Sequence, residues 1–321
     1  MSDLTLTIEN EKIVYYPLVE EEITLDISRS GAPSKLSFNV IKDETLNFQE
    51  GNLVKLAHKD KLIFVGFVFS KKRDKDQIIK VTAYDQLRYL KNKDTYVYEN
   101  KKASDLLKMI ATDYKLRVGE IDDTEHIIES RIEDNKTLFD IMKNALDETI
   151  KNKHKMYILY DEAGRIFLKD KDKMGLDIVI DQTCIENFDY TSSIDGETYN
   201  SIKLISENEK ASKRGYCTVE DKENVEKWGR LQYFEVIKDN SKKQSKAEGL
   251  LKLYNRKTRN LKVKNAIGDI RVRAGSRLIV DLNIGDIEVK KNMLVEDVKH
   301  TFKDNEHRMD LTLIGGDLFN A

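Results

Sequence analysis

The sequence predicts an α+β protein that is mainly β, with two β-barrel or β-sandwich domains and an α/β insert between them. Three observations predict this class. Short segments of alternating apolar and polar residues occupy both ends of the chain, helical periodicity occupies the middle, and the two ends match when one is shifted by 230 positions. We therefore expect an N-terminal β domain at residues 1–91, the insert at 92–190 and a C-terminal β domain at 191–321.

The first 91 residues predict a series of short strands. Leu4, Leu6 and Ile8 share one face of the first strand, because side chains two positions apart point the same way. Gly31 and Pro33 mark a turn between later strands. The expected strands lie at residues 4–10, 23–27, 36–40, 51–58, 62–70 and 78–84. Their regular spacing is typical of a barrel or sandwich.

The insert predicts two helices and a hairpin. Apolar residues recur at helical spacing over residues 104–114 and 137–151. Thr137 is the expected N-cap of the second helix, and Asp140 three positions later makes a variant of the capping box. The hairpin joins strands at 156–160 and 166–169.

The C-terminal domain predicts more strands and one helix. The strands are expected at residues 201–205, 215–219, 231–236, 278–282, 292–299 and 309–314. The helix is expected at about 241–258, with Ala247, Leu250, Leu251 and Tyr254 on its inner face.

Residues 64–83 and 294–313 form the internal match, each a strand, a polar turn and a return strand. If Val68 lies opposite Ile79, one face of each copy is apolar: Phe64, Val68, Ile79, Val81 and Ala83 in the first, and Leu294, Val298, Met309, Leu311 and Leu313 in the second. The other face carries Phe67, Phe69 and Ile78 in the first copy but Asp297, Lys299 and Arg308 in the second. We expect another domain or subunit to cover those three apolar residues. The alternative is that any two amphipathic hairpins align this well.

Composition excludes several classes of protein. The chain is 40% hydrophobic and 35% charged, with a net charge of −2, which excludes a uniformly basic nucleic-acid coat and an acidic disordered chain. No apolar run is long enough to span a membrane, and the first residues lack a secretory signal pattern. Cys184 and Cys217 are expected to be free thiols of a reducing cytosol.

No motif predicts catalysis, a metal or a cofactor. His300 and His307 face each other in the expected hairpin, but a third metal ligand is not evident, so a polar cross-strand pair is favoured over a metal site. Neither cysteine lies beside a histidine base, and nearby acids disfavour a Cys184 thiolate. Carboxylates are too numerous to identify a hydrolytic pair.

Charge is unevenly placed along the chain. Residues 241–264 contain nine Lys or Arg and one acid, whereas residues 120–148 contain ten acids and three bases. The basic stretch is a solvated helix face, a docking surface for an acidic protein, or a nucleic-acid site, and it lacks the interleaved aromatics that favour the last. Lys252, Arg256 and Arg259 are candidates for a charged interface.

Several long strings of the chain resemble the XkdQ/YqbQ-like proteins of prophages and phage-tail-like particles. They include SGAPSKLSF, FVGFVF, VTAYDQLRYLKNKDTYVYENKKASDLL, RIEDNKTLFDIMKNALDETI and GDIRVRAGS, and the resemblance runs from about residue 28 to residue 316. The chain departs from some tail hub proteins in lacking an added lytic or peptidoglycan-binding domain.

This resemblance implies the baseplate hub of a contractile tail, with two tail-tube-like β domains per chain. It implies a homotrimeric ring that joins the hexameric tail tube protein to the trimeric central spike protein, beside other baseplate proteins. A duplicated β unit lets three chains match a sixfold partner. The expected protein is made in the bacterial cytoplasm, assembles into the tail baseplate and has no specific nucleic-acid binding. The alternative is a tail-associated peptidoglycan hydrolase or cell-wall-binding protein.

Overall fold

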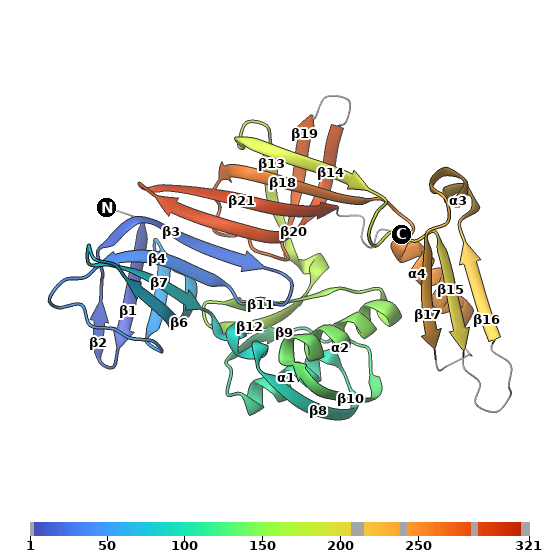
Figure 1. The fold of residues 1–321 in the computed structure, drawn as a ribbon, viewed down its shortest axis with the longest axis horizontal. Helices are drawn as coiled ribbons and strands as arrows, with labels where there is room; N and C mark the ends of the chain where they lie inside the picture. Colours follow the sequence, from blue (N-terminus) through green and yellow to red (C-terminus); the bar gives the residue numbers. More distant parts are fainter. Residues whose placement is uncertain (1–2, 207–214, 238–242, 284–287, 316–321) are drawn as a thin grey trace. The chain divides into compact units, whose positions relative to one another are not determined.

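Figure 1 presents the computed structural model of the chain, which describes residues 3–206, 215–237, 243–283 and 288–315. The chain divides into two compact units. Unit 1 comprises residues 1–189 and 262–313, and unit 2 comprises residues 190–261 and 314–321. The strands after residue 262 therefore cluster with the N-terminal strands. The three separate domains expected from the sequence stay a prediction.

The N-terminal strands of unit 1 form one antiparallel sheet. They are β1 (Leu4–Asn10), β2 (Ile13–Tyr15), β3 (Val19–Ser28), β4 (Lys35–Ile41), β5 (Leu53–His58), β6 (Lys61–Arg73) and β7 (Ile78–Tyr84), in the order β3-β4-β7-β6-β5-β1-β2. Alternate side chains form a core that includes the fully buried Ile8, Leu36, Val54, Leu56 and Val81. All six strands expected here are confirmed, and the short β2 is an addition.

Later strands of the chain continue this sheet. They are β13 (Gly175–Asp181), β14 (Asn187–Ser193), β18 (Thr258–Ile267), β19 (Arg277–Asn283), β20 (Glu288–Lys303) and β21 (Glu306–Gly315), and β14, β18 and β21 each have residues in both units. Strand β20 pairs antiparallel with β3, which places His300 opposite Leu25 and Phe302 opposite Ile23. The mainly β fold predicted from the sequence is confirmed. In the described residues the strand order is open, so this sheet does not close into a barrel.

Both halves of this sheet repeat one local arrangement. The Gly51 N–H donates to the Val68 carbonyl at 2.8 Å, and the Gly275 N–H donates to the Val295 carbonyl at 2.8 Å. Both glycines have a φ near +90°, 88° for Gly51 and 93° for Gly275. The residue that matches Val68 by this contact is Val295, three positions before the Val298 of the ungapped match. The two glycine turns are therefore alike, whereas the ungapped match over residues 64–83 and 294–313 stays a prediction.

The expected register of the first hairpin is wrong, although its faces are right. Val68 lies opposite Ala83, and Ile79 lies opposite Arg73, with a bulge after Val68. The expected and observed partners of Val68 differ by four positions, and an even shift leaves every side chain on the same face. All ten apolar residues that the sequence places on the two core faces are buried.

The segment between the two sheet halves carries two helices. Its elements are η1 (Gln86–Lys91), β8 (Lys93–Lys101), α1 (Ala103–Asp113), β9 (Val118–Ile121), β10 (Ile128–Thr137), α2 (Leu138–Lys153), β11 (Tyr157–Glu162), β12 (Arg165–Asp170) and η2 (Lys171–Met174). The Thr137 hydroxyl accepts from the Asp140 N–H at 3.1 Å, which confirms the predicted N-cap. Helices α1 and α2 pack together and against the antiparallel pair of β8 and β10.

Unit 2 contains a small three-stranded sheet covered on one face by a helix. Its elements are β15 (Ser201–Ser206), β16 (Gly215–Glu220), α3 (Lys222–Trp228), β17 (Gln232–Ile237) and α4 (Lys243–Tyr254). Ala247 and Leu250 of α4 are buried against the sheet, as expected. The helix predicted at 241–258 is shorter in the structure, because α4 ends at Tyr254 and Thr258 already belongs to β18, and residues 241–242 lie outside the described residues. None of the described helices is long and apolar enough to cross a membrane.

Candidate interaction surfaces

Phe67 and Phe69 lie on the outer face of β6, where the chain itself covers them in part. The Tyr89 ring of η1 lies 6.5 Å from the Phe67 ring and 6.2 Å from the Phe69 ring. The Arg88 guanidinium lies 5.4 Å from the centre of the Phe69 ring, within cation–π range. Both phenylalanines are half-buried. Residues 86–91 therefore supply part of the cover that the sequence assigns to another domain or subunit.

Ile78 and the three basic candidates lie elsewhere. Ile78 is half-buried at the start of β7, opposite Ile41 of β4. In unit 2, Lys252 is exposed on α4, and Arg256 and Arg259 are half-buried beyond its end. The structure thus brings Phe67 and Phe69 together and leaves the basic candidates as a separate group. Their role in subunit contact stays a prediction.

His300 and His307 form the predicted polar pair across β20 and β21. His300 Nδ1 lies 2.9 Å from His307 Nε2, and His300 Nε2 lies 3.0 Å from the Val272 carbonyl oxygen. Burial lowers the pKa of His300 to about 3, with a further contribution from His307. Burial and the nearby His58 lower the pKa of His307 to about 4. Both imidazoles are therefore neutral at pH 7.

Two further charged groups act on this histidine pair. The Arg273 charge lowers the pKa of His300, whereas the Asp269 charge acts in the opposite direction on both rings. No group of three or more His, Cys, Asp or Glu side chains in the described part of the chain is arranged to hold a metal. The arrangement is that of a hydrogen-bonded pair at the seam between the two sheet halves.

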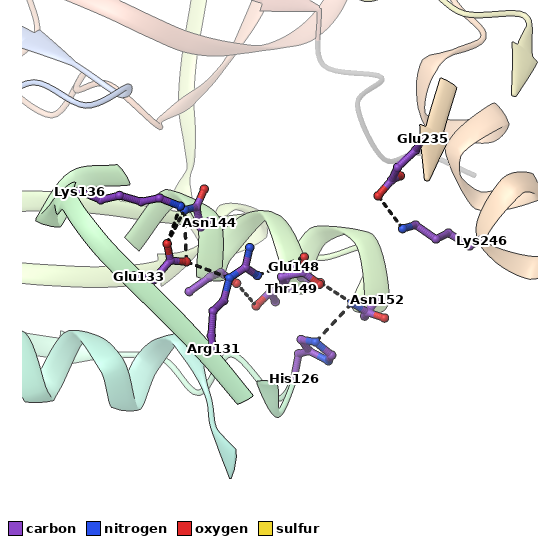
Figure 2. Close-up of polar contacts among 11 residues, drawn as sticks. His126, Arg131, Glu133, Lys136, Asn144, Glu148, Thr149, Asn152, Glu235 and Lys246 are labelled. Atoms are coloured by element: carbon purple, nitrogen blue, oxygen red, sulfur yellow. Dashed lines mark hydrogen bonds and ion pairs between the residues drawn. The ribbon is translucent and has the colours of Figure 1, made fainter. Parts of the chain in front are cut away.

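Glu133 of β10 is the centre of a buried ionic cluster that the sequence analysis missed. Figure 2 shows its carboxylate between Arg131, Lys136 and Asn144. Its oxygens lie 2.8 Å from Arg131 Nε and 2.7 Å from Lys136 Nζ, and Asn144 of α2 donates to both at 3.2 and 3.1 Å. The Glu133 side chain has no exposed surface. A buried charge is stable only when it is paired and hydrogen-bonded, as this one is. The bulge of β10 lies between Glu133 and Lys136, and Asn144 belongs to α2, so the cluster holds the bulge against this helix.

A second buried acidic site lies where η1 meets β11. Asp85 caps η1 by accepting the Leu87 N–H at 3.0 Å, and it also accepts the Ser34 N–H at 3.0 Å. Asp161 accepts from Gln86 at 2.9 Å. Burial raises the pKa of both carboxyl groups, and Asp161 raises that of Asp85 further. These acids hold backbone groups in place, which is a structural use of buried carboxylates.

An open groove of about 470 Å³ crosses the polar face of the sheet at the seam between β3 and β20. Five lysines and three aspartates line it: Lys35, Lys91, Lys262, Lys264, Lys299, Asp26, Asp297 and Asp310. Lys35 pairs with Asp26 at 2.8 Å, and Lys264 pairs with Asp310 at 2.8 Å. Lys299 lies opposite Asp26 in the strand register. Two of the five lysines are thus paired with aspartates of the groove.

Both cysteines are free thiols, as expected. Burial raises the pKa of Cys184, and Asp181 accepts its S–H through the main-chain carbonyl at 3.2 Å. A thiol in this state is a poor nucleophile. Cys217 contacts Gln244 of α4 at 3.0 Å.

Comparisons with known proteins agree on one group of relatives. The sequence profile described as YQBQ-like matches residues 23–314. Two Bacillus subtilis (strain 168) proteins are similar over 92% of this chain. The uncharacterized protein YqbQ is 30% identical, and the match covers 92% of its length. The phage-like element PBSX protein XkdQ is 29% identical, and the match covers 93% of its length. A solved structure, the 43 kDa tail protein of prophage MuSo2 from Shewanella oneidensis, matches with a TM-score of 0.73 at 10% identity, covering 98% of this chain and 100% of that one. This last likeness establishes the fold.

Proposed function

The chain belongs to the YQBQ-like family, and from this premise we propose that it is a structural hub of a contractile phage-tail or phage-tail-like baseplate. Three copies would form a ring between the hexameric tail tube and the trimeric central spike. The observation that supports the proposal is a glycine contact that recurs in the two sheet halves of unit 1. Gly51–Val68 and Gly275–Val295 make the same contacts in two sheet halves joined through β3 and β20.

The repeat matters because of symmetry. Three copies of a chain that folds one sheet unit twice present six similar units, which is what a sixfold tube requires of a threefold ring. The protein would be made in the bacterial cytoplasm and would assemble with the tube, the spike and other baseplate proteins. Phe67, Phe69 and Ile78 are proposed subunit contacts, because their outer surfaces remain half-exposed on one chain. Lys252, Arg256 and Arg259 are proposed charged contacts.

The mass of the purified chain in solution tests the ring. Light scattering on a sizing column should give about three times the 37.3 kDa of one chain for the protein alone, and a larger mass that contains three chains once tube and spike proteins are added. Electron microscopy of particles carrying a gold-labelled copy should place the label only at the spike end of the tube. A monomer in the presence of both partners, or a label along the whole tube, contradicts the proposal.

The hydrolase alternative has its own test. In the described residues, the most buried carboxylates are held in structural contacts: Glu133 by Arg131 and Lys136, and Asp85 by backbone N–H groups. A catalytic carboxylate instead needs access to its substrate. Purified cell walls incubated with the protein should therefore keep their turbidity. A steady fall in turbidity would support the hydrolase.

A further inference from the structure

The three-stranded sheet of unit 2 has two apolar faces, and the described residues of unit 2 cover only one of them. Ile202 and Leu204 of β15 point toward α4 and are fully buried. Side chains alternate along a strand, so Lys203 and Ile205 lie on the opposite face. No described element of unit 2 packs over that face, because α4 lies on the Leu204 side. Lys246 of α4 also pairs at 2.9 Å with Glu235, which lies beside Leu204 (Figure 2).

The register of the three strands arranges this outer face in rows. Tyr216 and Val236 flank Ile205 in one row, and Thr218 and Phe234 flank Lys203 in the next. Tyr216 is 74% exposed, Phe234 53% and Val236 50%. An exposed apolar cluster of this kind on a sheet typically marks an interface. Lys203 lies between Thr218 and Phe234, and its ammonium has no carboxylate in ion-pair distance among the described residues.

Unit 1 exposes a second apolar surface of opposite charge at its N-terminal edge. We call it the edge strip, residues 13–18, which include β2 and the segment after it. Ile13 is 56% exposed, Tyr16 73% and Leu18 65%. Glutamates at positions 11, 20, 21 and 22 flank it, and among the described residues none of them forms an ion pair. Strand β2 ends the sheet, so its outer backbone edge also has no strand partner in the part of the chain that the structure describes.

We infer that the outer face of the unit 2 sheet in one copy binds the edge strip of a second copy. Each surface is apolar, each carries charge that the described residues of its own chain leave unpaired, and the charges are opposite in sign. The two surfaces differ, so the contact is head-to-tail, and repeating it closes a ring when the rotation fits. The inference rests on the ring proposed above and assigns one of its contacts.

Cysteine cross-linking tests the contact directly. In a Cys184→Ser/Cys217→Ser chain, Val236→Cys combined with Leu18→Cys should give covalent dimers and trimers on a non-reducing gel after mild oxidation. Lys222→Cys on α3, combined with Leu18→Cys, is the matched control and should give none. A cross-link within one chain would overturn the inference, because the strip would then cover its own unit 2.

Charge reversal gives an independent measurement that needs no cysteine. Lys203→Glu should weaken self-association at least about tenfold in sedimentation equilibrium, and Glu21→Lys should restore it in the double variant. Lys222→Glu is the control and should leave self-association unchanged. If wild-type protein forms the trimer while Lys203→Glu does so equally well, the inference fails and the ring stands. If wild-type protein stays monomeric with tube and spike present, the proposed function fails as well.

Discussion

His300 makes folding depend on pH because the folded protein holds its imidazole in a neutral state. Its folded pKa of about 3 lies below the ordinary value of 6.5, so the unfolded chain binds more protons between those values. The free energy of unfolding should therefore keep the full His300 contribution above pH 6.5 and lose it as the pH falls from 6.5 toward 3. Between pH 7.5 and pH 5 the loss due to His300 should be about 2 kcal/mol.

Urea unfolding at the two pH values measures this effect. His300→Gln keeps a donor for the Val272 carbonyl but does not titrate, so its loss of unfolding free energy on acidification should be smaller by about that amount. His154→Asn at the exposed end of α2 is the control, and it should keep the wild-type pH dependence. An equal loss in wild type and His300→Gln would show that this histidine is not the acid-sensitive group.

At the level of elements, the two repeat glycines should differ in their tolerance of a side chain. Both have a positive φ, which costs an alanine about 1–2 kcal/mol. A Cβ at Gly51 would meet nothing within 4 Å, whereas a Cβ at Gly275 would lie 2.4 Å from Ile158 Cγ2. Ile158 is almost fully buried and has little room to move. Gly275→Ala should therefore destabilise the protein by roughly 1–3 kcal/mol more than Gly51→Ala.

Thermal and urea unfolding of both variants test this difference, and a double-mutant cycle identifies its cause. Ile158→Ala removes the clashing methyl group, so it should cancel much of the excess cost when combined with Gly275→Ala. Additive effects in the cycle, or equal costs at the two glycines, would mean that the contact with Ile158 does not decide the outcome.

Elements with a clear period could be predicted from the sequence, and those without one could not. Alternation located the strands around Leu36 and Val81, and helical spacing located the helix after Thr137. Strand β8 could not be predicted, because Tyr96 and Tyr98 are its only buried residues and most of the others are charged or polar. The pairing of β20 with β3 could not be predicted either, because it joins residues more than 260 positions apart and no local pattern in the sequence indicates such a pairing. The Glu133 cluster had no distinct signal among so many charged residues.

For the whole molecule, the balance of charge determines its affinity for nucleic acid. The net charge is −2, and two of the five lysines that line the groove pair with aspartates. Burial alone would raise the pKa of Asp310, but hydrogen bonds from Lys264 and from the Asn265 N–H lower it below the ordinary value. This aspartate is therefore ionised at pH 7 and neutralises Lys264. Such a surface gains little from releasing the counterions of DNA.

Fluorescence anisotropy with a short DNA duplex should consequently show no binding at 150 mM salt. Asp26→Asn combined with Asp310→Asn removes two of the three groove aspartates and frees Lys35 and Lys264. The double variant should bind DNA at low salt, and its affinity should fall as salt rises with a slope of roughly two released counterions. Asp60→Asn, at an exposed position outside the groove lining, should change nothing. Tight salt-sensitive binding by the wild-type chain would mean that the basic residues act on nucleic acid despite the aspartates.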